Sequence, residues 1–377
     1  MKNFRKIIFW IHLILGVVSG ISIFVMCVTG ALLAFESNIL DYAESNMRYV
    51  DSQNRQRLSV NEILDKVSQA KPDAKVSGIT INADPNSAAT VALGRDGNFF
   101  VNPYTGEILG DGAKGWRSFF RVNEDLHRWL AFPGDGRTVG KTINDACNVA
   151  FFLLAITGIY IWFPRKFQWS HFKPVLWFRR GLGGKARDFN WHNTIGFWTS
   201  TVLVILTLTG IVMSYQWANG LVYKLTGNEL PTQNQPAPPQ GQQNQPTTSN
   251  IPENLSQIWQ KAESRGSWKS INLRLPITND SAVFTIDEGI YTNKFGRSTL
   301  TIETKSGEIA KWEPYGEQNS GRQLRSWIRF THTGESFGLI GQLIGFLACV
   351  GGAFLVFTGI SLSLRRFANW RRRNETS

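Results

Sequence analysis

The stretches WIHLILG (residues 10–16) and WHNTIG (residues 191–196) share an unusual plan. In each, a Trp stands shortly before a His, and a Gly follows that His four residues later. Both stretches open a long apolar run. His12 and His192 are therefore ionisable groups at the edge of segments that otherwise avoid charge, and the fold has to give them partners.

Four segments of the chain contain no Asp, Glu, Lys or Arg, namely Ile7–Phe35, Ala146–Phe163, Thr194–Trp217 and Phe337–Leu364. Each is long enough to cross a hydrocarbon layer of about 30 Å as a helix. We therefore expect a mainly α-helical membrane protein with four transmembrane helices. The polar segments between these helices differ greatly in length.

Basic residues predict how the chain is oriented in the membrane. They gather at the N-terminus, between the second and third spans, and at the C-terminus. The positive-inside rule places all three segments in the cytoplasm, so the two long polar segments lie outside. The net charge of +12 is then mainly a topology signal, and it gives no separate reason to expect a nucleic-acid partner.

The two halves of the chain indicate a duplication. The first and third spans both carry a Thr-Gly dipeptide 17 residues after the His, and the second and fourth spans carry the same dipeptide. Each outer segment has an amphipathic helix followed by three strand-like runs, ending in YTGEIL or KSGEIA. In the first, SVNEILDKVSQAKP (59–72) predicts a helix capped by Ser59.

This plan divides the chain into nine segments. They are transmembrane helices at 1–35, 138–163, 191–217 and 333–364, small α+β modules at 36–137 (with the His127 segment) and 251–332, a basic cytoplasmic loop at 164–190, an outer Pro/Gln-rich linker at 218–250, and a basic cytoplasmic tail at 365–377.

Four of the five histidines stand at or near the start of a span. His12 and His192 head spans at the cytoplasmic end, whereas His127 and His332 precede spans at the outer end. A single His at a helix end is most often an interfacial residue, and His171, in the basic loop, is expected to be solvated. Four rings that pair by depth favour a shared explanation, a metal held between two imidazoles at each face.

The number of ligands indicates which metal group fits. Two imidazoles are too few for a closed zinc site, which takes four ligands, but they suit a haem, whose porphyrin supplies the other nitrogens. No C-x-x-C-H motif occurs, so the haem would be non-covalent and of b type. Gly16 and Gly196 lie one turn from their His and would admit a flat macrocycle. Close helix packing explains these glycines equally well.

The Thr-Gly dipeptides fit the same scheme. Seventeen helical residues rise about 25 Å, which brings Thr29 and Thr209 to the depth of the outer His pair. Thr157 and Thr358, at the inner ends of their spans, reach the depth of His12 and His192. These threonines would flank a haem, or they would only bond their own helix backbone, which is the commoner case.

Taken together, these motifs resemble the PepSY-associated transmembrane proteins. This bacterial family includes inner-membrane ferric-siderophore reductases of the FoxB type and iron-regulated relatives of the PiuB type. The resemblance covers nearly the whole chain and rests on HLILG, HNTIG, LHRWL, THTGESFG and YTGEIL, while KSGEIA is a weaker match. It implies a four-helix di-haem core in the bacterial inner membrane, with two PepSY-like periplasmic modules. The family's ligand positions match His12, His192, His127 and His332.

The resemblance also implies a function. We expect an oxidoreductase that passes electrons through two b haems to a periplasmic ferric siderophore or other Fe(III) chelate and releases Fe(II). No dinucleotide motif follows a strand, so the electron donor is a separate cytoplasmic reductant or a quinol. Four aromatic residues near the outer pair either dock the chelate or anchor the protein in the membrane, namely Trp129, Phe132, Trp327 and Phe330. The alternatives are a haem-free membrane-tethered binding or regulatory protein, and a haem b carrier with a non-iron acceptor.

Overall fold

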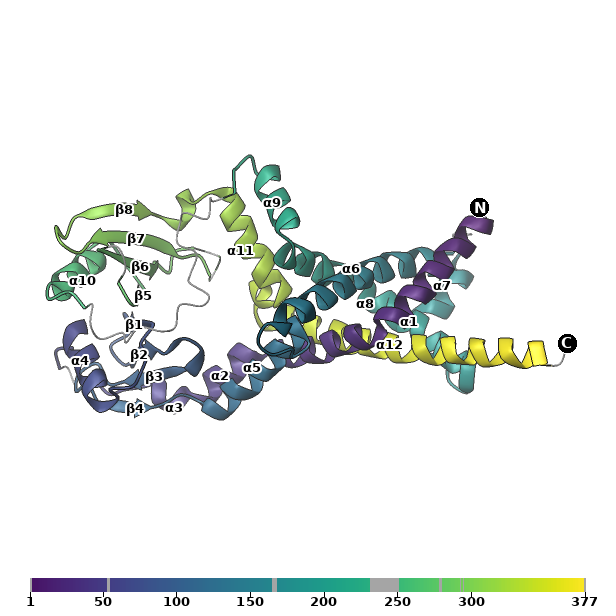
Figure 1. The fold of residues 1–377 in the computed structure, drawn as a ribbon, viewed down its shortest axis with the longest axis horizontal. Coiled ribbons are helices and arrows are strands. Elements are labelled where there is room, and N and C mark those ends of the chain that lie inside the picture. Colours follow the sequence, from purple (N-terminus) through teal and green to yellow (C-terminus); the bar gives the residue numbers. More distant parts are fainter. Residues whose placement is uncertain are drawn as a thin grey trace. The chain divides into compact units, whose positions relative to one another are not determined.

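The chain forms two compact units, shown in Figure 1. The computed structural model describes residues 2–52, 55–164, 168–230, 251–277, 280–291, 293 and 295–375. The first unit contains Met1–Glu36, Phe119–Gly227 and Leu324–Ser377, and the second contains Ser37–Ser118 and Asn228–Gln323. Each half of the chain thus contributes to both units.

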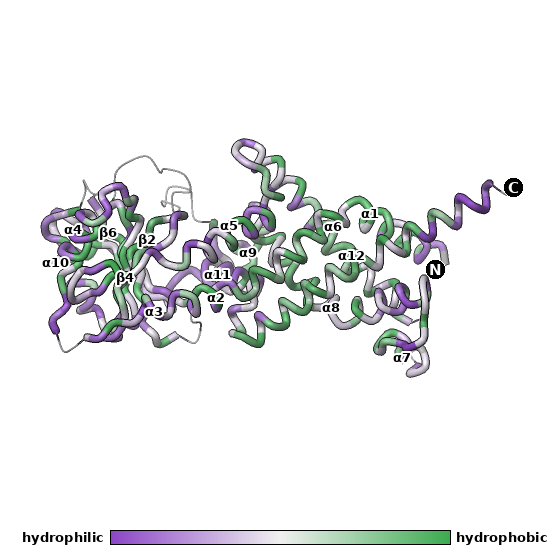
Figure 2. The backbone as a smooth tube through the Cα atoms, turned by 90° about the horizontal axis from the view of Figure 1, so that it is seen from below, coloured by the Kyte–Doolittle hydropathy of each residue, from purple (hydrophilic) through white to green (hydrophobic). Residues whose placement is uncertain are grey.

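Four long helices form the body of the first unit. They are α1 (Lys2–Leu33), α6 (Gly136–Trp162), α8 (Gly184–Ser214) and α12 (Gly338–Glu375). Each is long and apolar enough to cross a membrane, and Figure 2 shows the apolar residues along them in green. α1 and α8 each pack against both α6 and α12, so α1 and α8 stand at opposite corners of a four-helix bundle.

The outer surface of this bundle is apolar. Val18 and Ile21 of α1 are 80% and 79% exposed. Exposed side chains of this kind are suited to lipid rather than to water. The prediction of a mainly helical membrane protein with four spanning helices is therefore confirmed.

The remaining helices outside the sheet core are short. α5 (Lys114–Trp129) directly precedes α6, and α11 (Ser320–His332) precedes α12. The others are α2 (Glu36–Ala43), α3 (Ser45–Arg48), α7 (Trp169–Leu176), α9 (Gln216–Leu225), and the 3-10 turns η1 (Gly94–Asp96), η3 (Tyr315–Glu317) and η4 (Glu335–Phe337). The predicted outer modules extended to residues 137 and 332, whereas most of α5 and α11 belongs to the helical unit. Both are strongly amphipathic, which suits a helix with one packed face.

The second unit contains one eight-stranded sheet with strand order β4-β3-β2-β1-β5-β6-β7-β8. The strands are β1 (Gly78–Asn82), β2 (Ala89–Ala92), β3 (Asn98–Val101), β4 (Ile108–Gly110), β5 (Ser270–Arg274), β6 (Ser281–Asp287), β7 (Ser298–Glu303) and β8 (Ile309–Glu313), and all neighbours are antiparallel. The halves join where β1 pairs with β5, from Gly78 opposite Arg274 to Asn82 opposite Ser270. The two predicted modules are therefore halves of a single sheet.

Each half has a helix followed by four strands, where the sequence predicted three. The run NFFVNPYTGEIL forms β3 and most of β4, and the corresponding STLTIETKSGEI forms β7 and the first residue of β8. The turn within each run contains a glycine in the left-handed region, Gly106 (φ 75°) or Gly307 (φ 66°). The Gly-Glu-Ile endings, which indicated a duplication, mark these two hairpins.

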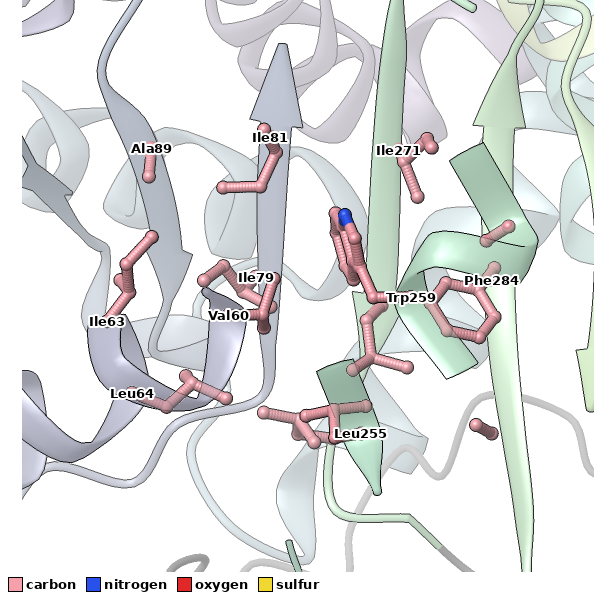
Figure 3. Close-up of a cluster of buried hydrophobic side chains, with 14 of the residues drawn as sticks. Val60, Ile63, Leu64, Ile79, Ile81, Ala89, Leu255, Trp259, Ile271 and Phe284 are labelled. Carbon is pink, nitrogen blue, oxygen red and sulfur yellow. The ribbon is translucent and has the colours of Figure 1, made fainter. Parts of the chain in front are cut away.

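One hydrophobic core spans the joint between the halves. α4 (Val60–Ala70) and α10 (Leu255–Glu263) pack against each other, and Figure 3 shows Leu64 and Leu255 of these helices beside Ile79 of β1. The capping box predicted at the start of α4 is present, because Ser59 and Glu62 each accept a backbone hydrogen bond from the other. The predicted apolar face of α4 is buried in this core.

Candidate functional site: two facing pairs of histidines

The first pair of histidines lies between the spanning helices. His12 of α1 and His192 of α8 face each other with ring centroids 6.4 Å apart. His12 Nδ1 lies 2.9 Å from Thr157 Oγ1 of α6, and His192 Nδ1 lies 2.9 Å from Thr358 Oγ1 of α12. All four spans thus contribute one side chain at this level.

The second pair repeats the arrangement with the roles of the helices exchanged. His127 of α5 and His332 of α11 have ring centroids 6.3 Å apart. Here the threonines come from α1 and α8, with Thr29 Oγ1 2.9 Å from His127 Nδ1 and Thr209 Oγ1 3.0 Å from His332 Nδ1. α1 and α8 therefore supply the histidines at one level and the threonines at the other.

The threonine hydroxyls determine which imidazole nitrogen carries the proton. Each hydroxyl donates its hydrogen to a backbone carbonyl one turn earlier, as Thr157 does to Leu153 O at 2.6 Å; the other three do the same. The hydroxyl oxygen is then left to accept a hydrogen from His Nδ1. In all four rings Nδ1 carries the proton and Nε2 keeps its lone pair, the form in which imidazole binds a metal.

Two further observations support this protonation state in the second pair. The Leu206 carbonyl also lies 3.0 Å from His332 Nδ1, and a carbonyl can only accept. Burial lowers the pKa of His127 to about 4, with His332 as a secondary cause, and burial also lowers the pKa of His332. Both rings are therefore neutral near pH 7.

In three of the four Thr-Gly dipeptides, the glycine makes room for a histidine ring. A Cβ on Gly158 or Gly359 would lie 3.4 Å from Cε1 of His12 or His192, and a Cβ on Gly30 would lie 3.3 Å from Cε1 of His127. The fourth, Gly210, faces the amide of Asn148 instead. Sequence reasoning placed these threonines at the right level but missed the hydrogen bond to the opposite histidine. The 17-residue spacing was the signal that could have suggested it.

A cavity of about 390 Å³ opens beside the first pair, a size within the range of about 300–1,000 Å³ typical of small-molecule sites. Gly16 and Gly196 both line it. A Cβ on Gly16 would meet Leu154 only at 3.7 Å, and one on Gly196 would meet Leu355 at 3.6 Å, which are ordinary contacts. Both glycines therefore line the cavity without close contact to a neighbouring helix, which is compatible with the macrocycle interpretation and gives little support to close helix packing.

Tight corners hold the second pair in place. A Cβ on Gly140 of α6 would overlap the carbonyl of Trp129, at the end of α5, and one on Gly341 of α12 would overlap the carbonyl of Gly334. Asn144 Nδ2 also donates to the backbone carbonyl of His127 at 2.8 Å. The sequence does not indicate these residues, because they act on backbone that only the folded chain brings near.

The geometry of both pairs suits a shared metal that brings other ligands with it. Two imidazoles bound through Nε2 at about 2 Å from one metal have ring centres about 6 Å apart, close to the separations found here. Within the described ranges, no cluster of three or more His, Cys, Asp or Glu side chains can hold a metal ion. A metal between either pair would need further ligands, such as the four nitrogens of a porphyrin. The His171 side chain lies outside the described residues.

Comparison with known proteins gives one family match. Residues 9–366 match the PepSY-associated TM region, a stretch that includes all four paired histidines. No curated protein matches the chain.

Proposed function

The chain belongs to the PepSY-associated transmembrane family, and from this premise and the site we propose that it is a membrane oxidoreductase that binds two b haems. His12 and His192 would hold one haem, and His127 and His332 the other. The observation that carries the proposal is that four imidazoles form two facing pairs, each ring with Nδ1 bonded to a threonine, while no residue that the structure describes makes a hydrogen bond to Nε2.

The residues of this chain prepare the two sites for such a group. Each threonine accepts from Nδ1, which fixes the ring orientation and increases the basicity of Nε2. Burial keeps protons from competing for Nε2 in the second pair, since the His127 pKa is about 4. Haem bound at these sites supplies one-electron redox chemistry. The 17-residue offset between His and Thr on one helix separates the two levels by about 25 Å.

The charge pattern supports the proposed orientation, and the proposed transfer runs from the cytoplasmic side outward. The basic loop and both basic termini are proposed to face the cytoplasm of a bacterial inner membrane, with the first pair near that side. Electrons would come from a separate reductant or a quinol and leave near the second pair. The proposed acceptor is a ferric siderophore or another Fe(III) chelate. One electron converts Fe(III) to Fe(II), and Fe(II) is bound less tightly by hard oxygen ligands.

The decisive experiment is a spectrum of the purified full-length protein from haem-replete cells. We expect a reduced-minus-oxidised b-type spectrum and two haems per chain by the pyridine haemochrome assay. Colourless protein would overturn the haem proposal and favour the alternative, a haem-free membrane-tethered binding or regulatory protein. A haem protein that passes no electrons to any ferric chelate, measured by trapping Fe(II), would instead indicate a non-iron acceptor.

A further inference from the structure

Two cationic side chains line the cavity beside the first pair. Lys185 lies in the first turn of α8 and Arg366 in the last third of α12, and both are among the residues that line the cavity. Its walls are otherwise mostly apolar, with Phe151 and Leu154 among them. Within the part of the chain that the structure describes, no carboxylate forms an ion pair with either cation.

Neighbouring cations on the same helices are placed differently. Arg187 and Arg365 both pair with the buried carboxylate of Asp188, at 3.0 and 3.4 Å. That carboxylate also accepts from Ser361 Oγ at 2.7 Å. Asp188 thus joins α8 to α12. Its partners Arg187 and Arg365 are close to Lys185 and Arg366 in the sequence, but they are neutralised by this carboxylate.

The guanidinium of Arg366 is supported in position by aromatic rings of α1. Its Cζ lies 5.0 Å from the ring centroids of both Phe9 and Trp10, a cation–π arrangement that restricts the side chain. Phe9 itself lines the cavity, so the charge is held at the same wall. Trp10 is the Trp that stands shortly before His12 in the WIHLILG stretch. One role of this Trp is the contact with Arg366.

We propose that Lys185 and Arg366 bind the carboxylates of an amphipathic ligand whose apolar body occupies the cavity. This inference rests on the proposed function, in which the ligand is haem and the carboxylates are its two propionates. Haem has a flat apolar body, two anionic groups at one edge and a central metal. The site has a matching group for each of these, namely apolar walls, two cations and two imidazoles. Charge-assisted hydrogen bonds to carboxylates are stronger than neutral ones, so the pair also sets which edge of the macrocycle faces the basic end of the bundle.

The test compares haemin with haemin dimethyl ester, which has the same ring and metal but no carboxylate charge. Full-length protein carrying His332→Ala, freed of haem, is titrated with each compound, and binding is followed by absorbance. We expect the acid to bind roughly a hundredfold more tightly than the ester, about tenfold for each charge-assisted contact. The double variant Lys185→Gln/Arg366→Gln should bind the two compounds equally. Arg371→Gln, which removes an exposed cation paired with Glu375 on the same helix, should keep the preference.

A second measurement does not depend on affinity. Removing the two cations should lower the midpoint potential of the remaining haem, because nearby positive charge favours the reduced form. If protein that retains Lys185 and Arg366 binds haemin and haemin dimethyl ester equally tightly, the inference is overturned while the haem proposal stays intact. The inference is also overturned if Arg371→Gln loses the preference for haemin as fully as the double variant does, because only the overall charge of the protein would then matter. Failure to bind either compound would instead overturn the proposed haem site and this inference with it.

Discussion

The two histidine pairs have the same chemistry but different supports. His12 and His192 lie within continuous spanning helices, so the helices themselves fix their positions. His127 and His332 lie near the ends of short helices, and their positions depend on the corners that connect α5 to α6 and α11 to α12. The same His–Thr contact can therefore form on a continuous helix or near the end of a short helix. Substitutions in the connecting corners are expected to disturb only the second kind.

The largest expected effect tests the proposed relay of electrons from the first pair to the second. In oriented vesicles with reductant only on the cytoplasmic face, an external ferric chelate should be reduced by the unaltered protein. His12→Ala should abolish this reduction, because electrons lose their entry site, although dithionite added outside should still reduce the outer haem. Trapping Fe(II) with a coloured chelator measures the rate.

The converse variant provides the matched control. His332→Ala should leave the first haem reducible from inside while the external chelate stays Fe(III). Chelate reduction at the unaltered rate in His12→Ala vesicles would mean that the first pair is not on the path, and the relay would have to be abandoned.

The next effect concerns which histidines share a haem. His127→Ala should reduce the haem content from two per chain to one, and the remaining spectrum should be the one that His12→Ala removes. His171→Ala should keep both haems, since that residue has no partner at its depth in the predicted arrangement. Pyridine haemochrome analysis with redox titration measures both quantities. Loss of both haems in His127→Ala would show that the two sites do not form independently.

Two glycine substitutions separate the rigid site from the turn-dependent one. Gly341→Ala should destabilise the protein by about 1–3 kcal/mol and weaken the second haem, because its Cβ would overlap the Gly334 carbonyl. Gly16→Ala should leave the stability of the haem-free protein unchanged, because its Cβ makes only an ordinary contact with Leu154.

The informative result for Gly16→Ala is haem binding at the first site. We expect it to weaken roughly tenfold, because the added methyl group would occupy space that the macrocycle needs. Gly345→Ala, where nothing lies within 4 Å, serves as the control in thermal unfolding and haem titration. A destabilised haem-free Gly16→Ala protein would favour close helix packing as the role of this glycine.

The smallest effect compares two threonines. Thr157→Val removes the acceptor for His12 Nδ1, and loss of such a contact to a metal-binding His typically weakens binding about 10–100-fold. Thr209→Val should weaken binding less, because the Leu206 carbonyl remains 3.0 Å from His332 Nδ1. Affinities and midpoint potentials of the two variants give the comparison, and equal losses would show that the Leu206 contact contributes nothing.

The sequence predicted the elements that depend on local pattern. Four charge-free runs gave four spans, and the 17-residue spacing placed Thr29 at the depth of His127. The hydrogen bond between them was missed because side-chain direction at a helix crossing depends on packing. Lys185 and Arg366 were interpreted only as topology signals, since a cavity that gives a cation a further role is not visible in a linear charge pattern.

The joint between β1 and β5 could not be predicted for a related reason. Alternating apolar residues indicate a strand but do not say which strand will be its neighbour, and these two lie nearly 190 residues apart in the sequence. Two separate modules were therefore the simplest prediction. The short hairpin turns at Gly106 and Gly307 were also missed, although the residues between the strands, NPYTGE (102–107) and TKSGE (304–308), are typical turn formers.

The same joint constrains how the protein is made. β1 is complete early in synthesis, but its partner β5 begins only at Ser270, after α6 and α8 have been produced. At ordinary translation rates of about 5–20 residues per second, the open edge of β1 waits on the order of ten seconds for its neighbour. An unpaired strand edge is a template for wrong pairing. During this interval newly made protein exposes such an edge, and a ribosome that stalls within α8 leaves a half-sheet whose edge has no partner from its own chain.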